Sequence, residues 1–386
     1  MPGHELEARI RAHMTELGDA QLLRTLRSPA GFDLSSNDYL GLSTHPLLKE
    51  RLIESVRREG VGSTGSRLLR GQRDSFASVE KGFACLKGTT SSLYFSSGYL
   101  ANIAVLTTFP DQEDVILSDE LNHASLIDGV RLSRAKRAIF PHADVGRLAE
   151  LIAEHAAARQ VFVVTESLFS MDGDIAPLNE YAKLCSDTGA ALIVDEAHAV
   201  GVYGASGSGL IELAGVADDV FVSINTAGKA LGVGGAFVAG PSWAIDYMVQ
   251  RARPFIFSTA PPPSQAAALE ASLAIVASEP ERRETLQRLS RDLRARLTAA
   301  DLPVLPGTSQ IVPVVLGDNE RAMAVAGALQ MQGFDVRAIR PPTVAPGTAR
   351  LRIAVNTGLT GDIMQRFVTV LADAVRKQSG CSAVSS

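Results

Sequence analysis

The sequence predicts an α/β fold with three parts. These are a large domain whose mostly parallel, seven-stranded sheet is sandwiched by helices, a smaller C-terminal α+β domain and an N-terminal helical arm. Two observations predict this fold. Short apolar runs alternate with helical patterns between about residues 90 and 260, and several runs read as strands covered on both faces. Beyond a proline cluster at 261–263, long helical patterns dominate.

Seven apolar runs are expected to form the strands of the large sheet. Helical patterns separate them. The pattern at 176–190 places Leu178, Tyr181 and Cys185 on one face and reaches Gly189, which fits a helix stop. The strands are expected at residues 92–98, 114–119, 137–142, 161–167, 191–198, 219–225 and 235–240.

The flanking regions predict the other two parts. The first 27 residues mix charged and apolar side chains and indicate an amphipathic helix. We expect the arm at 1–40, the large domain at 41–265 and the small domain at 266–386. Elements of the C-terminal part are expected as helix 280–300, strand 311–317, helix 320–332, strands 334–340 and 349–355, and helix 361–378.

Composition limits the possible function classes. The 37 basic and 42 acidic residues give a net charge of −5, which disfavours binding to a nucleic-acid backbone. With 46% apolar and 20% charged residues, the chain can form a large core. The three cysteines are widely separated, the N-terminus lacks an apolar signal segment, and the uncharged run at 88–110 contains Asn102. We therefore expect a soluble, cytoplasmic protein without a structural metal or a membrane helix.

The motif Asp195-Glu196-Ala197-His198 ends an apolar strand pattern, at the edge where parallel sheets bind ligands. One interpretation is the nucleotide site of a motor protein, which also requires a Gly-x-x-x-x-Gly-Lys-Ser/Thr loop. The only Gly-Lys pair, Gly228-Lys229, is followed by Ala230, which disfavours this interpretation. The GVGSTG segment at 60–65 follows a helical stretch, so we expect a turn there and not a dinucleotide site.

A second interpretation combines three features. Asp195 ends a strand, Lys229 follows 229 − 195 = 34 residues later in a glycine-rich turn, and residues 96–99 precede a helix whose amides could hold a phosphate. Pyridoxal phosphate uses such groups: an amine for its aldehyde, a carboxylate for its ring nitrogen and amides for its phosphate. Taken singly, Lys229 could be a surface lysine and Asp195 a helix cap. Together they predict a pyridoxal-phosphate site.

These motifs resemble the α-oxoamine synthase family of pyridoxal-phosphate enzymes, which has the aspartate-aminotransferase fold, also called fold type I. The resemblance covers nearly the whole chain, because nine segments follow the family's order. They are 36–42, 62–71, 95–102, 122–125, 166–174, 194–198, 226–232, 253–263 and 339–352. The chain departs from the family's pattern at 199–200 and just after residue 352, which leaves the acyl-chain preference open.

The resemblance implies roles for individual residues. Lys229 would bind the cofactor aldehyde and move the substrate Cα proton, and Asp195 would pair with the ring nitrogen. His198 would bond the phenolic oxygen, while His123 would stack on the ring and approach the substrate carboxylate. Further cofactor contacts are implied for Gly98, Tyr99, Ser170 and Thr226, and for Ser258 and Thr259, which would reach the phosphate of the neighbouring subunit of a homodimer.

The resemblance also implies substrate-binding residues. Arg352 would grip the amino-acid carboxylate, although Arg350 alternates with it on one strand pattern and both could face solvent. Arg24, Asn37 and Thr343 would line the substrate site. The alternative to Arg24 is Arg27, one turn away if both lie on one helix.

The implied reaction is a decarboxylative condensation. The segment 339–352 is most similar to family members that join L-alanine to a pimeloyl thioester, on coenzyme A or an acyl-carrier protein. They release CO2 and the free thiol and form 8-amino-7-oxononanoate for biotin biosynthesis. Two alternatives stay open: another family member, such as a glycine C-acetyltransferase, and a non-catalytic regulator built on this fold.

Overall fold

The computed structural model describes residues 4–382, which form two compact units. Unit 2 comprises Asn37–Ser170 and Asp174–Leu286. Unit 1 comprises the chain up to Ser36, the short stretch Met171–Gly173 and the chain from Gln287 onward. The two units do not correspond one to one with the three expected domains. The expected boundaries at 1–40, 41–265 and 266–386 therefore remain a prediction.

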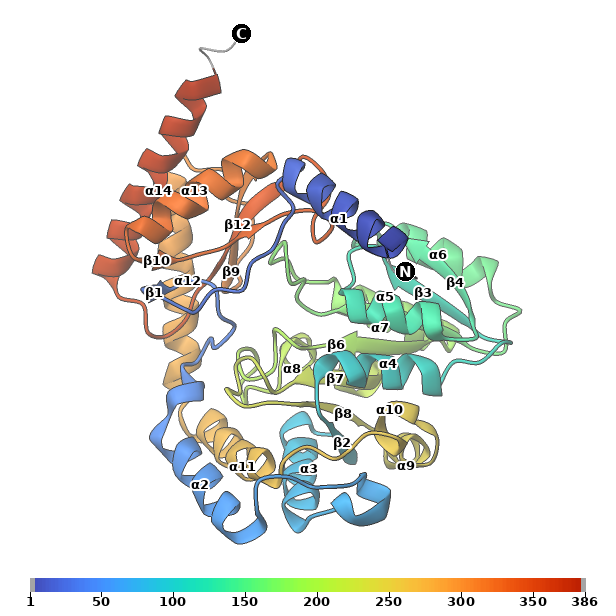
Figure 1. Cartoon of the computed structure of the whole chain (residues 1–386). Coiled ribbons are helices and arrows are strands. Elements are labelled where there is room, and N and C mark those ends of the chain that lie inside the picture. Colours follow the sequence, from blue (N-terminus) through green and yellow to red (C-terminus); the bar gives the residue numbers. More distant parts are fainter. Residues whose placement is uncertain (1–3, 383–386) are drawn as a thin grey trace. The chain divides into compact units, whose positions relative to one another are not determined.

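Unit 2 is built around one seven-stranded sheet (Figure 1). The strand order is β2-β8-β7-β6-β5-β3-β4; β8 runs antiparallel to β2 and β7, and the other neighbours are parallel. All seven expected strands are present, so the mostly parallel sheet is confirmed. The strands are β2 (Ser91–Phe95), β3 (Val115–Asp119), β4 (Lys136–Phe140), β5 (Val161–Glu166), β6 (Ala191–Asp195), β7 (Val220–Thr226) and β8 (Ala236–Gly240).

Helices cover both faces of this sheet, which explains the uninterrupted apolar strands. On one face, the core combines strand residues with side chains from α4 (Gly98–Thr108), α5 (Ala124–Leu132), α9 (Ser242–Arg251) and α10 (Arg253–Ile256). On the other, Phe83 of α3 (Asp74–Lys87) stacks on Phe237 with ring centroids 4.1 Å apart. Further elements of unit 2 are η1 (Leu42–Thr44), α2 (Pro46–Glu59), η2 (Arg67–Gly71), α6 (Val145–Glu154), α7 (Leu178–Thr188), α8 (Leu210–Ala214), η3 (Ala217–Asp219) and α11 (Pro263–Ser278).

Several helices of unit 2 begin where a parallel strand has just ended. Side chains accept hydrogen bonds from the first-turn amides: Ser97 caps α4, His123 caps α5 and Asp144 caps α6. Helix N-termini are therefore gathered beside the C-terminal ends of the strands, and their free amides favour anionic groups there.

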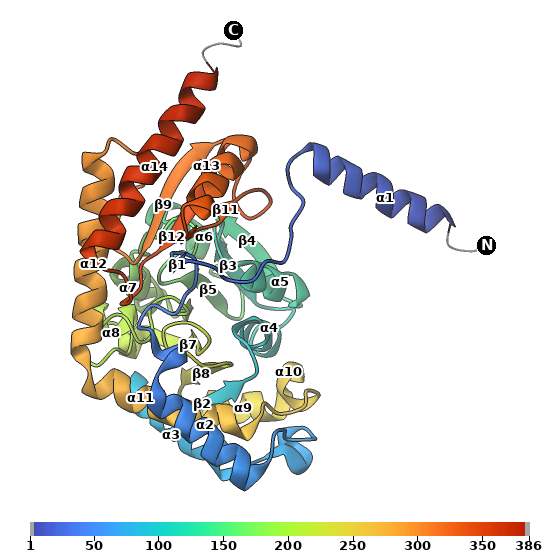
Figure 2. The ribbon, with the colours of Figure 1, turned by 60° about the vertical axis from the view of Figure 1, so that its left-hand side comes forward.

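Unit 1 contains a three-stranded antiparallel sheet in the order β11-β12-β9. Its strands are β9 (Ile311–Gly317), β11 (Ala338–Ile339) and β12 (Ala349–Ala354), and β1 (Phe32–Asp33) pairs in parallel with β10 (Phe334–Asp335). Helices α13 (Asn319–Met331) and α14 (Gly361–Ser382) pack together (Figure 2). Helix α12 (Pro280–Ala299) contributes residues to both units.

Two expectations about unit 1 are wrong. The single strand expected at 334–340 is two short strands, β10 and β11, in different sheets, because the chain turns where the Val336 amide donates to the Phe334 carbonyl. The N-terminal helix α1 (His4–Asp19) ends well before Arg24. Gln21 has a φ of 56° and the Leu22 amide donates to the Leu17 carbonyl, which closes the helix end. Arg24 and Arg27 therefore do not share a helix.

Across residues 4–382, none of the helices is both long and apolar enough to span a bilayer.

Candidate active site

Asp195 is the last residue of β6, and both of its carboxylate oxygens are held by the chain. The Asn102 side chain donates to Oδ2 over 2.8 Å, and the Ala197 amide donates to Oδ1 over 2.8 Å. The residue is buried, with 5% of its surface exposed. Because each carboxylate oxygen can accept two hydrogen bonds, the oriented Asp195 retains capacity for a further donor.

Lys229 follows β7 and His198 follows β6, and their side chains are in contact. The Lys229 Nζ lies 2.8 Å from Nε2 of His198, and the Tyr39 hydroxyl lies 2.7 Å from Nδ1 of the same ring. Tyr39 donates its proton to Oδ1 of Asn37 over 3.0 Å, so its oxygen accepts from Nδ1 of His198. That assignment of the ring proton leaves Nε2 to accept from Lys229. The contacts form one directed chain from lysine to asparagine.

His123 is connected to Asp195 through two intermediate side chains. Its Nδ1 lies 2.7 Å from the Ser125 hydroxyl, and the Asn102 amide donates to that hydroxyl over 2.8 Å as well as to Asp195. Although the ring is accessible to solvent, the protein atoms around it desolvate it and lower the pKa of His123. The charge of Lys229 lowers this pKa further, and Asp195 opposes the shift. His123 is therefore neutral near pH 7.

Glu166 is a buried carboxyl group next to Asp195. The two residues are register partners on β5 and β6, so their side chains point to the same face of the sheet. Burial raises the pKa of Glu166 well above its ordinary value, and the charge of Asp195 adds to the shift, while Lys229 and the backbone of His123 and Ser170 oppose it. Its Oε1 finds no hydrogen-bond partner within residues 4–382. The surroundings of Glu166 therefore favour the protonated form of its carboxyl group.

Two of the expected cofactor contacts, Gly98 and Thr226, meet at the start of α4. A Cβ atom at Gly98 would lie 2.4 Å from Oγ1 of Thr226, so only glycine fits this close approach of α4 to the end of β7. Tyr99 points its hydroxyl to Asp128 on α5, leaving its backbone amide as the group available to a ligand. Ser170 is nearly buried, with 8% of its surface exposed, in the segment after β5.

Ser258 and Thr259 follow α10 and lie near this helix start within the same chain. They line a cavity of about 20 Å³ together with Phe95 and Ser96. Their expected contact with the phosphate of a second subunit remains a prediction.

Two of the expected substrate residues, Arg24 and Thr343, come together in unit 1. They line a cavity of about 80 Å³ with Leu22, Ile339 and Arg340, among others. Burial lowers the pKa of Arg340, and the charge of Arg24 lowers it further. Arg27 instead donates to the Gln330 side chain over 3.0 Å. Of the two candidates left open by the sequence, Arg24 lines this cavity and Arg27 contacts Gln330.

Arg350 and Arg352 are both buried on β12, with 6% and 7% of their surface exposed, so the expectation that both could face solvent is wrong. Arg350 pairs with Asp172 over 2.6 Å. This ion pair holds Arg350 on a carboxylate of unit 1. Arg352 lies two residues further along β12.

Glu196, the second residue of the Asp195 motif, has a structural task. It forms a fully buried ion pair with Lys87, and its Oε1 accepts the amides of Leu210 and Ile211 at the start of α8. A Cβ atom at Gly209 would lie 2.3 Å from the same carboxylate. The two carboxylates of the motif therefore differ: Asp195 is oriented and retains capacity for a further donor, whereas Glu196 is engaged by Lys87 and the start of α8.

Sequence reasoning assigned no role to four residues of this network: Tyr39, Asn102, Ser125 and Glu166. Asn102 carried a signal, because it is a polar residue within an apolar helix pattern and is 2% exposed. Glu166 ends an apolar strand pattern, as Asp195 does. The contact of Tyr39 with His198 and that of Ser125 with Asn102 join segments that are distant in sequence, so they had no local signal.

Comparisons with known proteins agree with this geometry. The family model for aminotransferase class I and II matches residues 29–371. The 8-amino-7-oxononanoate synthase of Anaeromyxobacter dehalogenans is 45% identical over 375 residues, which cover 96% of this chain and 94% of that protein. The Geobacter sulfurreducens enzyme of that name is 41% identical over 379 residues, covering 94% of this chain and 97% of the relative.

Solved structures give the same result. Serine palmitoyltransferase from S. paucimobilis, with a bound PLP–myriocin aldimine, superposes with a TM-score of 0.90 at 28% identity, covering 98% of this chain and 99% of that one. The 8-amino-7-oxononanoate synthase of Francisella tularensis superposes with a TM-score of 0.79 at 29% identity, covering 90% of this chain and 99% of that one. The chain therefore belongs to the aminotransferase class I and II family, and among its members it is similar to the 8-amino-7-oxononanoate synthases.

Proposed function

We propose that this protein is a pyridoxal-phosphate-dependent acyltransferase that condenses L-alanine with a pimeloyl thioester. The products are 8-amino-7-oxononanoate, CO2 and the free thiol, and the reaction serves biotin biosynthesis. The observation that carries the proposal is the 45% identity to 8-amino-7-oxononanoate synthase over 96% of the chain. The donor thiol is coenzyme A or an acyl-carrier protein.

The residues of unit 2 fit pyridoxal 5′-phosphate. Asp195 is buried and fixed, and it retains capacity for the N–H of a protonated pyridine ring. The N-terminus of α4, with Gly98 held against Thr226, presents backbone amides to a phosphate. Tyr99, Ser170 and Thr226 are proposed to complete this cradle. The fit therefore rests on the Asp195 carboxylate, the Lys229 amine and the N-terminus of α4, which all belong to unit 2.

When bound, the cofactor supplies an aldehyde for the substrate amine and a ring that withdraws electrons from Cα. Lys229 would hold the aldehyde at rest and carry the Cα proton through Nζ during turnover. His198, whose Nε2 lies 2.8 Å from Lys229 in the structure, would bond the phenolic oxygen once the lysine is engaged. His123 would stack on the ring as a neutral imidazole, since its pKa is lowered.

The remaining residues are proposed to bind substrate or to complete a second site. Arg352 would hold the amino-acid carboxylate, and Arg24, Asn37 and Thr343 would line the substrate site. Ser258 and Thr259 would reach the phosphate across a homodimer interface, which makes a cytoplasmic homodimer with shared active sites the proposed active form.

The test is thiol release from pimeloyl-coenzyme A by the purified protein with L-alanine, glycine or L-serine. Release with L-alanine and formation of the aminoketone by mass spectrometry are expected. Lys229→Ala is expected to abolish turnover and the visible absorbance of the bound cofactor. Turnover with glycine and none with L-alanine would move the assignment to a glycine C-acetyltransferase.

A further inference from the structure

The segment that follows β5 is a short hairpin that carries Ser170. The Phe169 amide donates to the Asp174 carbonyl over 3.0 Å, and the Ala176 amide donates to the Ser167 carbonyl over 3.1 Å. Leu168 and Ile175 form an antiparallel bridge between these two pairs. Ser170 comes directly after the last paired residue, so its position depends on where the Phe169–Asp174 pair is held.

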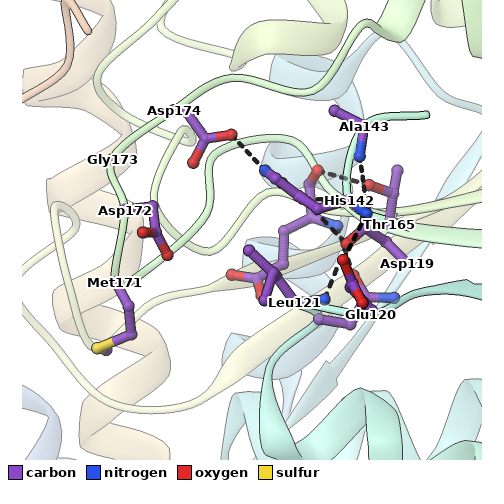
Figure 3. Close-up of polar contacts among 12 residues, drawn as sticks. Asp119, Glu120, Leu121, His142, Ala143, Thr165, Met171, Asp172, Gly173 and Asp174 are labelled. Atoms are coloured by element: carbon purple, nitrogen blue, oxygen red, sulfur yellow. Dashed lines mark hydrogen bonds and ion pairs between the residues drawn. The ribbon is translucent and has the colours of Figure 1, made fainter. Parts of the chain in front are cut away.

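His142 contacts both arms of this hairpin. Its Nε2 lies 2.7 Å from Oδ2 of Asp174, and its ring meets the Phe169 ring edge-on with centroids 4.4 Å apart. On its other side, Nδ1 lies 3.0 Å from Oδ1 of Asp119, at the end of β3. Figure 3 shows the imidazole lying between the two carboxylates. One side chain therefore joins the hairpin to the sheet edge.

The sheet side of this contact is rigid. Asp119 is 1% exposed and also accepts the amides of Leu121 and Ala143 over 2.9 and 3.0 Å. Ala143 has a φ of 55°, a conformation that few non-glycine residues adopt, so its hydrogen bond to Asp119 fixes an otherwise unfavourable turn. His142 is thus presented to the hairpin from a fixed turn.

The charge of the ring follows from its partners. Both ring nitrogens face carboxylates, and only the doubly protonated imidazolium can donate to both. The carboxylate of Glu120 accepts the His142 amide over 3.0 Å. The buried Tyr181 of α7 lies close enough to Asp119, Asp174 and Asp144 for their charges to help raise its pKa. Hydrogen bonds and charges of Asp119 and Asp174 outweigh burial and raise the pKa of His142 to about 10.

We propose that His142 is a positioning residue: its imidazolium fixes the hairpin 167–176 between Asp119 and Asp174 and thereby places Ser170 for the cofactor phosphate. The proposal rests on the proposed function for its ligand, but the fixation of the hairpin can be measured without it. The backbone of Ser170 is also among the groups that act on Glu166, the neighbour of Asp195, so the hairpin contacts the ligand-binding edge at a second point.

The test uses the full-length apoprotein and compares the wild type with His142→Gln. We expect the amides of Phe169 and Ala176 to lose hydrogen-exchange protection by at least about 10-fold. Affinity for pyridoxal 5′-phosphate is expected to fall about 10- to 100-fold, as when outer partners of a ligand site are removed. Ser170→Ala is the matched control, expected to weaken binding and leave the protection of both amides unchanged.

A second variant tests the charge. Asp174→Asn removes one carboxylate from the imidazolium, so hairpin protection should be lost at a pH at least about one unit lower than in the wild type. Equal protection and equal affinity in wild type and His142→Gln would overturn the proposal. If His142→Gln does not fold, an unshifted pH midpoint in Asp174→Asn would overturn it. If the wild type binds no pyridoxal phosphate, the proposed function fails while the exchange data still decide the role of His142.

Discussion

Two histidines follow the ends of two neighbouring parallel strands, yet their environments differ. His123 comes after β3 and His142 after β4. Desolvation and Lys229 lower the pKa of His123, whereas two carboxylates raise that of His142 to about 10. His123 keeps an accessible neutral ring, and His142 is held at both nitrogens. Position at a strand end therefore does not decide the role of a histidine; the number of fixed partners does.

The adjacent residues Asp195 and Glu196 also differ in their partners: Asp195 retains capacity for a ligand, whereas Glu196 pairs with Lys87 inside the fold. The variant Lys87→Met tests the structural role of Glu196. Glu196 would remain buried without its counter-charge, which is expected to lower the free energy of unfolding by about 3–5 kcal/mol. Urea denaturation measures this change. A decrease in unfolding free energy below about 1 kcal/mol would show that Lys87 is not the main partner of Glu196.

Asp195→Asn tests the other half of that contrast. We expect turnover to fall by about 10²–10³-fold, the range found when one fixed electrostatic contact to the reacting group is removed. The unfolding free energy should change by less than in Lys87→Met, because the hydrogen bonds from Asn102 and the Ala197 amide can adjust to the new side chain. Steady-state kinetics and denaturation of the same preparation provide both values. Full activity in the variant would remove Asp195 from the proposed site.

The pH dependence of stability distinguishes the two histidines. His142 has a folded pKa of about 10, above the usual value of about 6.5, so its protonation stabilises the folded chain fully below about pH 6.5. That contribution is lost as the pH rises toward 10, at up to about 1.4 kcal/mol per pH unit. Denaturation midpoints between pH 6.5 and 9.5 should fall more steeply in the wild type than in His142→Asn. Identical slopes would contradict the doubly bonded imidazolium.

The smallest effect is expected in the titration of His123. Lys229 is one cause of its lowered pKa, so Lys229→Met should raise the NMR midpoint of His123 by a few tenths of a unit, on the order of one screened charge. The signal of His142 should stay in its protonated form through pH 8 in both proteins. A shift at both histidines would indicate a general rearrangement and not the local charge of the lysine.

Much of the fold could be predicted because it depends on local patterns. All seven strands of the large sheet carry apolar runs, and helix stops such as Gly189, with a φ of 75°, have a local cause. The prediction of a single strand at 334–340 was wrong because this stretch forms two short strands that belong to different sheets. No local pattern in the sequence indicates that division.

Motifs singled out Asp195, His198 and Lys229 as site residues; the structure brings Lys229 and His198 into contact, and the roles of all three remain predictions. The site was not predictable where a contact joins distant segments. Asn102 reaches Asp195 across 93 positions of sequence, and Tyr39 reaches His198 across 159. His142 stood within an expected strand, and nothing nearby in the sequence named Asp119 and Asp174 as its partners.

The antiparallel placement of β8 has a consequence for how the lysine segment folds. Lys229 lies between β7 and β8, which pair from Thr226 and Ala236 outward, and the Ala227 amide also donates to the Gly235 carbonyl. A parallel neighbour would have required a crossover connection of a dozen or more residues, whose closure costs somewhat more chain entropy. Here the loop closes over few residues, so the lysine turn can form from local contacts early in folding. Insertions between 227 and 235 should therefore slow folding as well as displace the amine.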